Sequence, residues 1–260
     1  MARRGVRRLR LLTYNIQAGA RVARLSHYIT QGWKQILPHR EKLANLERVA
    51  RVIAEFDIVG LQEADPGSLR SGFVNQAEFL AANAGFPFWT QQVNRNLARI
   101  VRSGNALISR FEPLAVLDLT LPGRLPGRGA LVAEYGCDGQ RLCVVNVHLS
   151  LGPQARRRQL DFLCELIGER EHVVLMGDFN THVDGRELER LYRRTRLEPP
   201  PAAPSSFPSW RPRRPIDHVL VSRSLSIRAI ETLPLALSDH LPVAVEVGLP
   251  PALAGAFEPG

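Results

Sequence analysis

The sequence predicts a layered α/β fold in which sheets and helices pack around apolar interiors. Short apolar runs of strand length alternate with amphipathic helical patterns in the first third of the chain, and strand-like runs dominate afterwards. With 260 residues, of which 45% are hydrophobic and 23% charged, the chain has the composition of a globular protein with a sizeable core. We therefore expect one domain that spans residues 1–260.

Seven apolar runs are expected to form buried strands, and a polar residue ends or follows each of them. In chain order they lie at residues 9–16, 58–62, 105–109, 142–148, 173–176, 218–222 and 243–247. Four segments carry the apolar repeat of an amphipathic helix. These segments lie at residues 40–55, 76–84, 153–170 and 185–192. Together the elements predict sheets that are covered by helices.

Two stretches follow neither pattern. Residues 19–39 contain Tyr28 and Trp33 with only a weak amphipathic trace, which favours a surface insertion or a lid. Residues 199–215 include seven prolines, which excludes a helix or a central strand and predicts a long loop. Strand patterns continue on both sides of each stretch, so we do not expect either to be a linker between domains.

The chain is strongly basic, with a formal net charge of +9 and a sequence pI near 10.4. A basic surface attracts nucleic acid or anionic lipid, so the charge is compatible with an anionic substrate or partner. Only Lys34 and Lys42 are lysines, and such an arginine bias also arises from a GC-rich genome without selection for binding. The charge by itself therefore does not decide between these explanations.

The cysteines and the apolar pattern favour a cytoplasmic protein. Cys137, Cys143 and Cys164 cannot all pair with one another, and they lack the clustering of a zinc site. The start of the chain has no apolar signal segment, and no run approaches the roughly 20 residues that span a bilayer. We expect a cytoplasmic location with peripheral membrane contact left open, and we infer no obligate protein partner.

Polar residues gather at the ends of the predicted strands, where layered folds commonly assemble their sites. Several have structural alternatives, such as a turn for Asn15, a solvated carboxylate for Glu63 and a backbone-bonded histidine for His148. Asp178 and Asn180 alternate directly after a strand, which is harder to explain structurally. The blocks are Asn15, Gln62-Glu63, Gly104-Asn105, Asn146-Val147-His148, Gly177-Asp178-Phe179-Asn180, Ile216-Asp217 and Ser238-Asp239-His240.

In this order the blocks resemble the signature of the endonuclease/exonuclease/phosphatase superfamily, which includes deoxyribonuclease I, apurinic endonucleases and neutral sphingomyelinases. The resemblance runs from Asn15 to His240 and so covers nearly the whole chain. Its most specific parts are Gly177-Asp178-Phe179-Asn180 and Ser238-Asp239-His240. It implies a four-layer α/β sandwich, in which two mostly antiparallel sheets pack face to face and helices cover both outer faces.

The resemblance also implies a hydrolase that cuts a phosphate ester with the help of Mg²⁺ or Mn²⁺. Such hard cations prefer oxygen ligands, and the expected ligands are Asn15, Glu63 and Asp239. The expected catalytic residues are His148, Asp178, Asn180, Asp217 and His240. We expect Asp178 to orient and deprotonate the attacking water, while the amide and imidazole groups stabilise charge in the transition state. Asp217 is expected to orient His240 and to favour its charged form.

The substrate class is less determined by the sequence. The segment Gln62-Glu63-Ala64-Asp65 lacks the Glu-Thr-Lys of apurinic endonucleases and adds a negative charge, which argues against a preference for abasic sites. The expected substrate-binding residues are Asn105, Trp210, Arg213 and Arg214. We favour a general phosphodiesterase or phosphatase. The alternatives are a nuclease that acts on DNA or RNA, an enzyme that acts on phospholipid headgroups, and a non-catalytic module of the same fold.

Overall fold

The computed structural model describes residues 8–19, 40–97, 101–123, 127–137 and 139–257. The strands of its first sheet are β1 (Arg8–Asn15), β2 (Ile58–Ala64), β3 (Phe88–Gln91), β4 (Arg95–Leu97), β5 (Val101–Ser109), β12 (Ser226–Thr232) and β13 (Val243–Gly248). Those of its second sheet are β6 (Ala115–Thr120), β7 (Gly129–Cys137), β8 (Gln140–His148), β9 (His172–Asp178), β10 (Leu197–Glu198) and β11 (Asp217–Ser222). The α-helices are α2 (Arg40–Ile53), α3 (Gln76–Ala84), α4 (Pro153–Ile167) and α5 (Arg186–Arg194).

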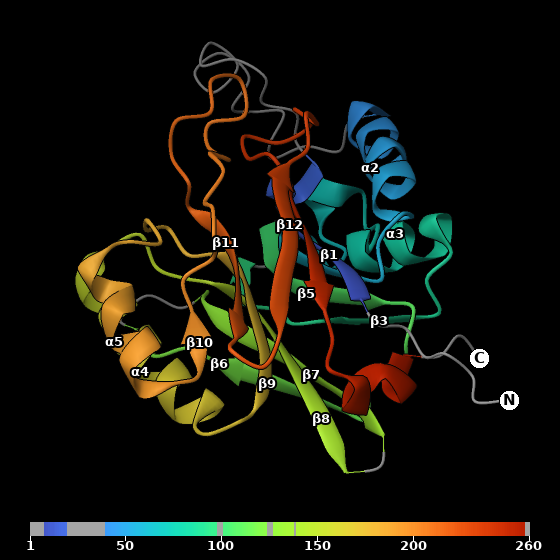
Figure 1. Ribbon diagram of the computed structural model, residues 1–260. Coiled ribbons are helices and arrows are strands. Elements are labelled where there is room, and N and C mark those ends of the chain that lie inside the picture. Colours follow the sequence, from blue (N-terminus) through green and yellow to red (C-terminus); the bar gives the residue numbers. More distant parts are fainter. Residues whose placement is uncertain (1–7, 20–39, 98–100, 124–126, 138, 258–260) are drawn as a thin grey trace, which may run out of the picture.

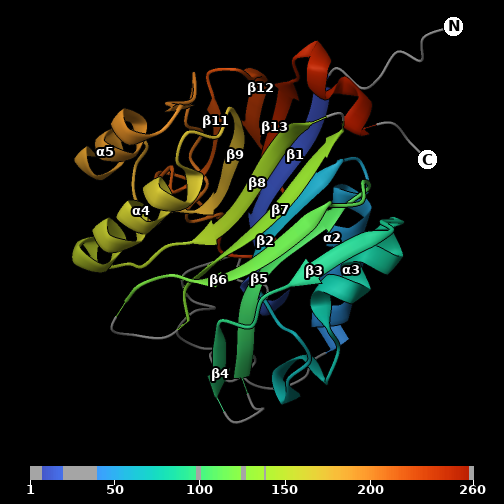
Figure 2. The same cartoon turned by 90° about the horizontal axis from the view of Figure 1, so that it is seen from below.

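The sheets pack face to face between two pairs of helices, which gives four layers (Figures 1 and 2). The strand order is β12-β13-β1-β2-β5-β3 in the first sheet, where β4 also pairs with β5, and β10-β11-β9-β8-β7-β6 in the second. Among the described strands, β1 and β2 are parallel, as are β8 and β9, and the other pairs are antiparallel. The predicted α/β sandwich is confirmed.

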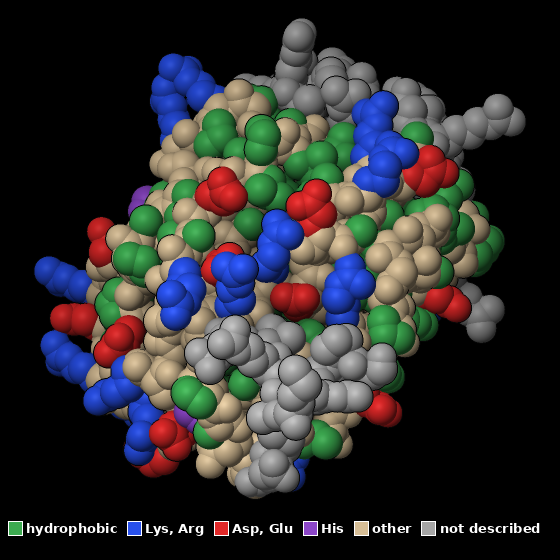
Figure 3. All heavy atoms as spheres, turned by 45° about the vertical axis from the view of Figure 1, so that its right-hand side comes forward, with side chains coloured by type: hydrophobic (Ala, Val, Ile, Leu, Met, Phe, Trp, Pro, Cys, Tyr) green, Lys and Arg blue, Asp and Glu red, His purple; other side chains and the backbone are tan. Residues whose placement is uncertain are grey.

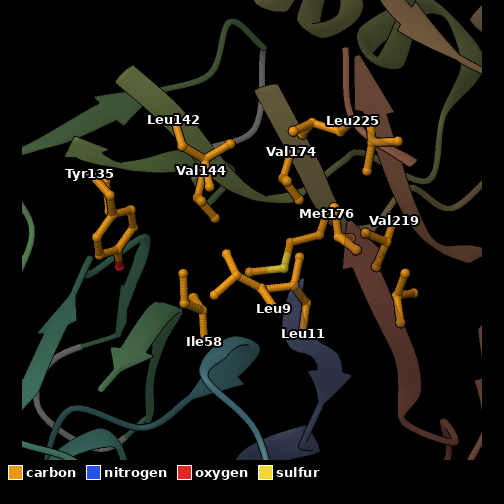
Figure 4. Packing of buried hydrophobic residues seen from close by; sticks show 14 of the residues in the cluster. Leu9, Leu11, Ile58, Tyr135, Leu142, Val144, Val174, Met176, Val219 and Leu225 are labelled. Carbon is orange, nitrogen blue, oxygen red and sulfur yellow. The ribbon is translucent and has the colours of Figure 1, made fainter. Parts of the chain in front are cut away.

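Aliphatic side chains fill the space between the inner faces of the sheets. Leu9 and Ile58 from the first sheet face Val174 and Met176 from the second, and all four are fully buried (Figure 4). Burying a side chain of this size stabilises the fold by roughly 1.5–3 kcal/mol. One further apolar cluster joins α2 and α3 to the outer face of the first sheet, and another joins α4 and α5 to the second. These three interfaces hold the layers together.

Local sequence signals explain where the helices begin and end. Asn75 caps α3, because its side-chain oxygen accepts hydrogen bonds from the N–H groups of Ala77 and Glu78 at 3.1 and 3.2 Å. The same helix ends at Gly85, which adopts the left-handed conformation that favours glycine. Pro153 opens α4 at the first turn, where its missing N–H costs no helical hydrogen bond.

Side chains on the inner faces change from apolar to polar toward one end of the sandwich. On β9, Val174 and Met176 lie in the core, and Asp178 follows two residues later on the same face. The same change occurs on β1 with Leu9, Leu11, Thr13 and Asn15, on β8 with Val144, Asn146 and His148, and on β11 with Val221, Val219 and Asp217. Strands from both sheets therefore bring buried polar groups to the same end.

The seven predicted strands and four predicted helices are all present, with ends that move by a few residues. The structure adds β3, β4, β6, β7, β10 and β12, which the sequence analysis did not identify. Two of these, β6 and β12, lie at sheet edges and bury few side chains, so they lack the apolar signal on which the prediction depended.

The proline-rich stretch connects β10 to β11 without a helix or a strand of its own, as expected. Its one β-bridge joins Phe207 and Arg214. Residues 20–39 of the predicted insertion or lid at 19–39, including Tyr28 and Trp33, lie outside the described part of the chain. No helix within the described residues has the length and apolar character needed to cross a membrane.

Candidate functional site

Three polar residues lie in a row across neighbouring strands of the second sheet. His148 of β8 pairs with Asp178 of the parallel strand β9, and Asp178 pairs with Asp217 of the antiparallel strand β11. Directly paired residues project from the same face of a sheet, so these side chains point into the gap between the sheets. Backbone register, rather than a loop conformation, sets the spacing of this row.

Asp178 is the centre of the polar cluster, and only 2% of its surface is exposed. Asn15 reaches across from the first sheet, and its Nδ2 donates to Asp178 Oδ2 at 3.1 Å. The Nε2 atoms of His148 and His240 lie 3.3 and 3.8 Å from the same oxygen. The backbone N–H of Asn180 donates to the other oxygen, Oδ1, at 3.0 Å. Groups from both sheets and two loops therefore converge on one carboxylate.

Burial and neighbouring charges shift the pKa values of this cluster. Burial raises the pKa of Asp178 to about 7, and Asp217 adds to this rise while His240 opposes it. Burial also lowers the pKa of His148 well below its usual range, helped by the positive charges of Arg128 and His240. His148 is therefore neutral at physiological pH, and Asp178 can exchange a proton near neutrality.

His240 behaves in the opposite way because it faces two carboxylates. Its Nδ1 donates to Asp217 Oδ2 at 2.7 Å, so the expected carboxylate–imidazole pair is present. Burial alone would lower the pKa of His240, but the negative charges of Asp217 and Asp178 outweigh it and raise the pKa to about 10. His240 is therefore a fixed positive charge beside Asp178.

The three residues expected to bind metal lie at the same end of the first sheet. Glu63 is the second-last residue of β2 and follows Gln62, which pairs with Asn15 in the sheet. Ser238 links Asn15 and Asp239, because its hydroxyl donates to Asn15 O at 2.7 Å and lies 3.2 Å from Asp239 Oδ1. Their side chains offer carboxylate and amide oxygens, which are the ligands that Mg²⁺ and Mn²⁺ prefer.

A second group, Asp178, Asp217 and His240, also has the chemistry of a metal site, since one ligand atom from each lies within 4.8 Å of the others. Two observations indicate that this group binds protons rather than a metal ion. His240 Nδ1 carries the hydrogen that bonds Asp217, and the raised pKa of the ring keeps the remaining nitrogen protonated. A histidine must be neutral to bind a metal, so the oxygen set of Glu63, Asn15 and Asp239 is the better candidate.

Unusual backbone conformations occur beside the cluster. Glu63 and Asn180 have φ values of 56° and 52°, in the left-handed region that non-glycine residues rarely adopt. Gly177 has φ of 145°, and a Cβ there would lie 1.9 Å from the carbonyl oxygen of Val147. Only glycine therefore permits the close pairing of β9 with β8 immediately before Asp178. Strained residues of this kind concentrate at functional sites.

Comparison with known proteins identifies the family. A profile described as the Endonuclease/Exonuclease/phosphatase family matches residues 12–240. The chain belongs to the endonuclease/exonuclease/phosphatase family. A search of curated proteins gives no match.

Solved structures share the fold of this family at low sequence identity. An endonuclease/exonuclease/phosphatase from Beutenbergia cavernae has a TM-score of 0.68 and 21% identity over 94% of this chain and 72% of that chain. A mannosyl-6-phosphatase from Bacteroides thetaiotaomicron has a TM-score of 0.66 and 20% identity, covering 92% of this chain and 99% of that one. A humanized TDP2 from D. rerio has a TM-score of 0.64 and 14% identity, covering 94% and 100%. These similarities concern the fold.

Asn105, expected near the substrate phosphate in this family, is 1% exposed. Its Nδ2 donates to Gly129 O at 2.8 Å and to Gln92 Oε1 at 3.3 Å. Its Oδ1 is buried, and the described residues give it no hydrogen-bond partner. The preceding Gly104 is required by packing, because a Cβ there would lie 1.6 Å from Gln92 O. The Gly-Asn block therefore holds β5 against neighbouring segments.

The three expected substrate-binding residues of the proline-rich loop differ in their contacts. Arg214 is exposed, and its guanidinium carbon lies 5.6 Å from the centroid of the Phe207 ring. The centroid of that ring lies 4.9 Å from the ring centroid of His240, so Arg214 contacts a residue that packs on the cluster. Arg213 is exposed and Trp210 is half-buried. Neither of these two has a described side-chain contact with the cluster.

Sequence reasoning missed several residues of this family member's site. Ser206 and Phe207 contact the Asp217–His240 pair, but a serine and a phenylalanine in a proline-rich stretch give no signal of that contact. Arg128 belongs to none of the sequence blocks, and its effect on the pKa of His148 appears only in three dimensions. Ser206, Phe207 and Arg128 lie near the cluster because of the paths of the loops that carry them.

Asp65 differs from its expected role. Asp65 was expected to present a negative charge after Glu63, but its side chain is 0% exposed. Its Oδ1 accepts hydrogen bonds from the N–H groups of Gly67 and Ser68 at 3.0 and 2.7 Å, and its Oδ2 accepts from the Ser68 hydroxyl at 2.6 Å. Asp65 stabilises its own loop and presents no carboxylate to a substrate.

Proposed function

We propose that this family member is a divalent-metal-dependent phosphoesterase in which Asp178 activates the attacking water. The observation that carries the proposal is the convergence of Asn15, His148, His240 and the Asn180 N–H on the buried carboxylate of Asp178. Its raised pKa of about 7 suits a group that must accept a proton near neutral pH. Membership of the family supports a phosphate ester as the substrate.

The residues at the end of the first sheet fit a hard divalent cation. Glu63 is half-buried, and its backbone adopts the left-handed conformation where the register between β2 and β5 shifts. Glu63, Asn15 and Asp239 would hold Mg²⁺ or Mn²⁺ through oxygen atoms. The bound cation would supply Lewis-acid stabilisation of the charge that develops on the phosphate.

The chain's own groups would then divide the remaining work. Asp178 would orient and deprotonate the water, and Asn15 would hold that carboxylate in place through its 3.1 Å hydrogen bond. His240, kept positive by Asp217, would face the non-bridging phosphate oxygens together with Asn180 and His148. The neutral ring of His148 would act as a hydrogen-bond donor rather than as a charge.

The class of phosphate ester is less constrained. Solved structures with this fold include a mannosyl-6-phosphatase and TDP2, so the fold accommodates different substrates. On the face in Figure 3, basic and acidic side chains are interspersed, and no continuous basic surface covers it. Surface ion pairs such as Arg8–Glu246 at 3.2 Å neutralise part of the positive charge. These observations favour a phosphodiesterase or phosphatase, with a nuclease as the second candidate.

Hydrolysis of bis-p-nitrophenyl phosphate tests the proposal. We expect EDTA to abolish the reaction and Mg²⁺ or Mn²⁺ to restore it, because the oxygen ligands suit these ions. A parallel screen with one metal-loaded preparation should include plasmid DNA, abasic duplex, RNA, phospholipid and small phosphomonoesters. A nuclease would show steep salt dependence, since its arginines would displace counterions from the phosphate backbone. Full activity in excess chelator on a verified substrate would exclude a role for the metal.

The inferred place of action is the cytoplasm. Cys143 and Cys164 are free and buried, which is compatible with a reducing compartment. Fractionation of cells that express the full chain would test this inference, and recovery outside the cytoplasm, in the secreted fraction, would contradict it.

A further inference from the structure

One serine of the proline-rich loop contacts both sides of the Asp217–His240 pair. Ser206 is 0% exposed, and its hydroxyl donates to Asp217 Oδ2 at 2.5 Å. Its carbonyl oxygen accepts from the N–H of Leu241, the residue after His240, at 2.8 Å, and its own N–H donates to Arg214 O at 3.1 Å. Ser206 thus uses all its polar groups to join three segments of chain.

The Ser206 hydroxyl has one hydrogen to give, and distance decides its acceptor. Arg214 O lies 3.5 Å away, whereas Asp217 Oδ2 lies at 2.5 Å. That same oxygen accepts the hydrogen bond of His240 Nδ1 at 2.7 Å. The other oxygen, Oδ1, is buried and has no hydrogen-bond partner among the described residues. Without the Ser206 hydroxyl, one of two donors that fix this carboxylate would be lost.

Phe207 restrains the imidazole from a second direction. Its ring centroid lies 4.9 Å from that of His240, with an angle of 51° between the planes. Phe207 itself is held in place, because its N–H donates to Arg214 O and its carbonyl accepts from Arg214 N, at 3.1 and 2.9 Å. The loop therefore supplies both a polar contact to the acceptor of His240 and an apolar contact to its ring.

We propose that Ser206 and Phe207 are positioning residues that hold the Asp217–His240 pair in its working orientation. Ser206 fixes the Asp217 carboxylate and Phe207 limits rotation of the imidazole, so that His240 Nε2 stays directed at the site of Asp178, 3.8 Å away. The inference rests on the proposed phosphoesterase function of the site. It assigns the proline-rich loop a role in placing the catalytic pair, in addition to any contact with substrate.

Ser206→Ala removes only the hydroxyl, and Ser222→Ala is its matched control. Ser222 is also 0% exposed and lies on β11 with Asp217, where its hydroxyl oxygen accepts from Val173 N at 2.9 Å, away from the cluster. With metal-loaded full-length protein, we expect Ser206→Ala to lower kcat roughly tenfold to hundredfold at unchanged KM, as loss of a hydrogen bond to a charged group does. Ser222→Ala should retain wild-type kcat.

A double-mutant cycle separates positioning from general damage. If Ser206 acts through Asp217, the change Ser206→Ala should alter kcat by less than about twofold once Asp217→Asn is present. An equal loss in both backgrounds would overturn the proposal. Phe207→Leu, which keeps apolar bulk, should lower kcat less than Ser206→Ala does, and wild-type kcat in both variants would also overturn it.

A spectroscopic readout makes the inference independent of turnover. The Nδ1 proton of His240, bonded to a carboxylate, should give a far-downfield proton resonance in the wild-type protein, assigned by its loss in His240→Gln. We expect this resonance to broaden or disappear in Ser206→Ala and to persist in Ser222→Ala. Persistence in Ser206→Ala would contradict the inference even if no phosphate ester were hydrolysed. Absence of hydrolysis in the wild-type protein would contradict the proposed function alone.

Discussion

Two buried polar clusters lie side by side between the sheets, and they differ in charge. In the first, Gln62 Nε2 donates to Asn146 Oδ1 at 2.6 Å, and Asn146 Nδ2 donates to the carbonyl oxygens of Leu61 and Ala106, both at 2.9 Å. In the second, Asp178 and Asp217 face His240. Each cluster has one buried side-chain oxygen without a described partner, Gln62 Oε1 in the first and Asp217 Oδ1 in the second. The first cluster is neutral; the second is charged.

The difference indicates separate purposes for groups only two residues apart on β8. Neutral amides that exchange hydrogen bonds across the sheets stabilise the sandwich, because each bond replaces one to water without burying a charge. Charged groups with shifted pKa values cost stability when buried, and they persist where their reactivity is needed. Substitutions in the charged cluster should therefore lower activity, and substitutions in the neutral cluster should lower stability.

The largest expected effect is on catalysis. Asp178→Asn preserves shape and removes the proton acceptor, so turnover should fall by about 10² to 10⁴. Because burial already disfavours the charged form of Asp178, the neutral amide should leave the thermal unfolding midpoint unchanged or raise it. Turnover and thermal unfolding measured on one preparation check both parts. Wild-type turnover would mean that another residue activates the water.

A substitution in the neutral cluster should lower stability more than activity. Asn146→Ala leaves the carbonyl oxygens of Leu61 and Ala106 without their side-chain donor, and the cost should be about 2–4 kcal/mol of unfolding free energy. Urea unfolding measures this loss. The kcat per folded molecule should fall far less than in Asp178→Asn, and a loss of equal size would show that the two clusters do not act separately.

A smaller effect is expected at Glu63. Glu63→Gln keeps the size of the side chain and weakens an oxygen ligand, so the metal concentration needed for half-maximal activity should rise at least about tenfold. Raising the metal concentration should restore part of the activity, whereas it should not help Asp178→Asn. Direct titration of Mn²⁺ by calorimetry gives a readout apart from turnover, and unchanged affinity would remove Glu63 from the ligand set.

The last expected effect is a dependence of stability on pH. In the folded protein the pKa of His240 is about 10, above its ordinary value of 6.5, so its protonation stabilises the fold at low pH and this contribution is lost as pH rises through 10. The unfolding free energy of chelator-treated protein should therefore decline between about pH 7.5 and 9.5. Asp217→Asn should flatten the decline, and an identical slope in both proteins would contradict the assignment.

The strand and helix patterns predicted an α/β fold, and the family resemblance predicted the four layers and the residues of the charged cluster. Apolar runs that end in Asn15, His148 and Asp178 carry a local signal, and strand ends at one side of a sandwich must meet. Edge strand β6, with an almost wholly exposed pattern, carries no such signal. Nor does Ser206, whose contact with Asp217 depends on how seven prolines direct a loop. The buried role of Asp65 was missed because a carboxylate near Glu63 looks the same in sequence whether it faces solvent or its own loop.

The row of His148, Asp178 and Asp217 across β8, β9 and β11 has a consequence for insertions and deletions. Connections outside the strands can change length without altering which residues pair, so engineered exchanges at residues 199–205 should keep the spacing of the row and leave Ser206 and Phe207 in place. Deleting one residue inside β9 would instead turn Asp178 to the outer face of the sheet. Library design for new substrates should therefore place length variation in the loops and restrict the three strands to substitutions.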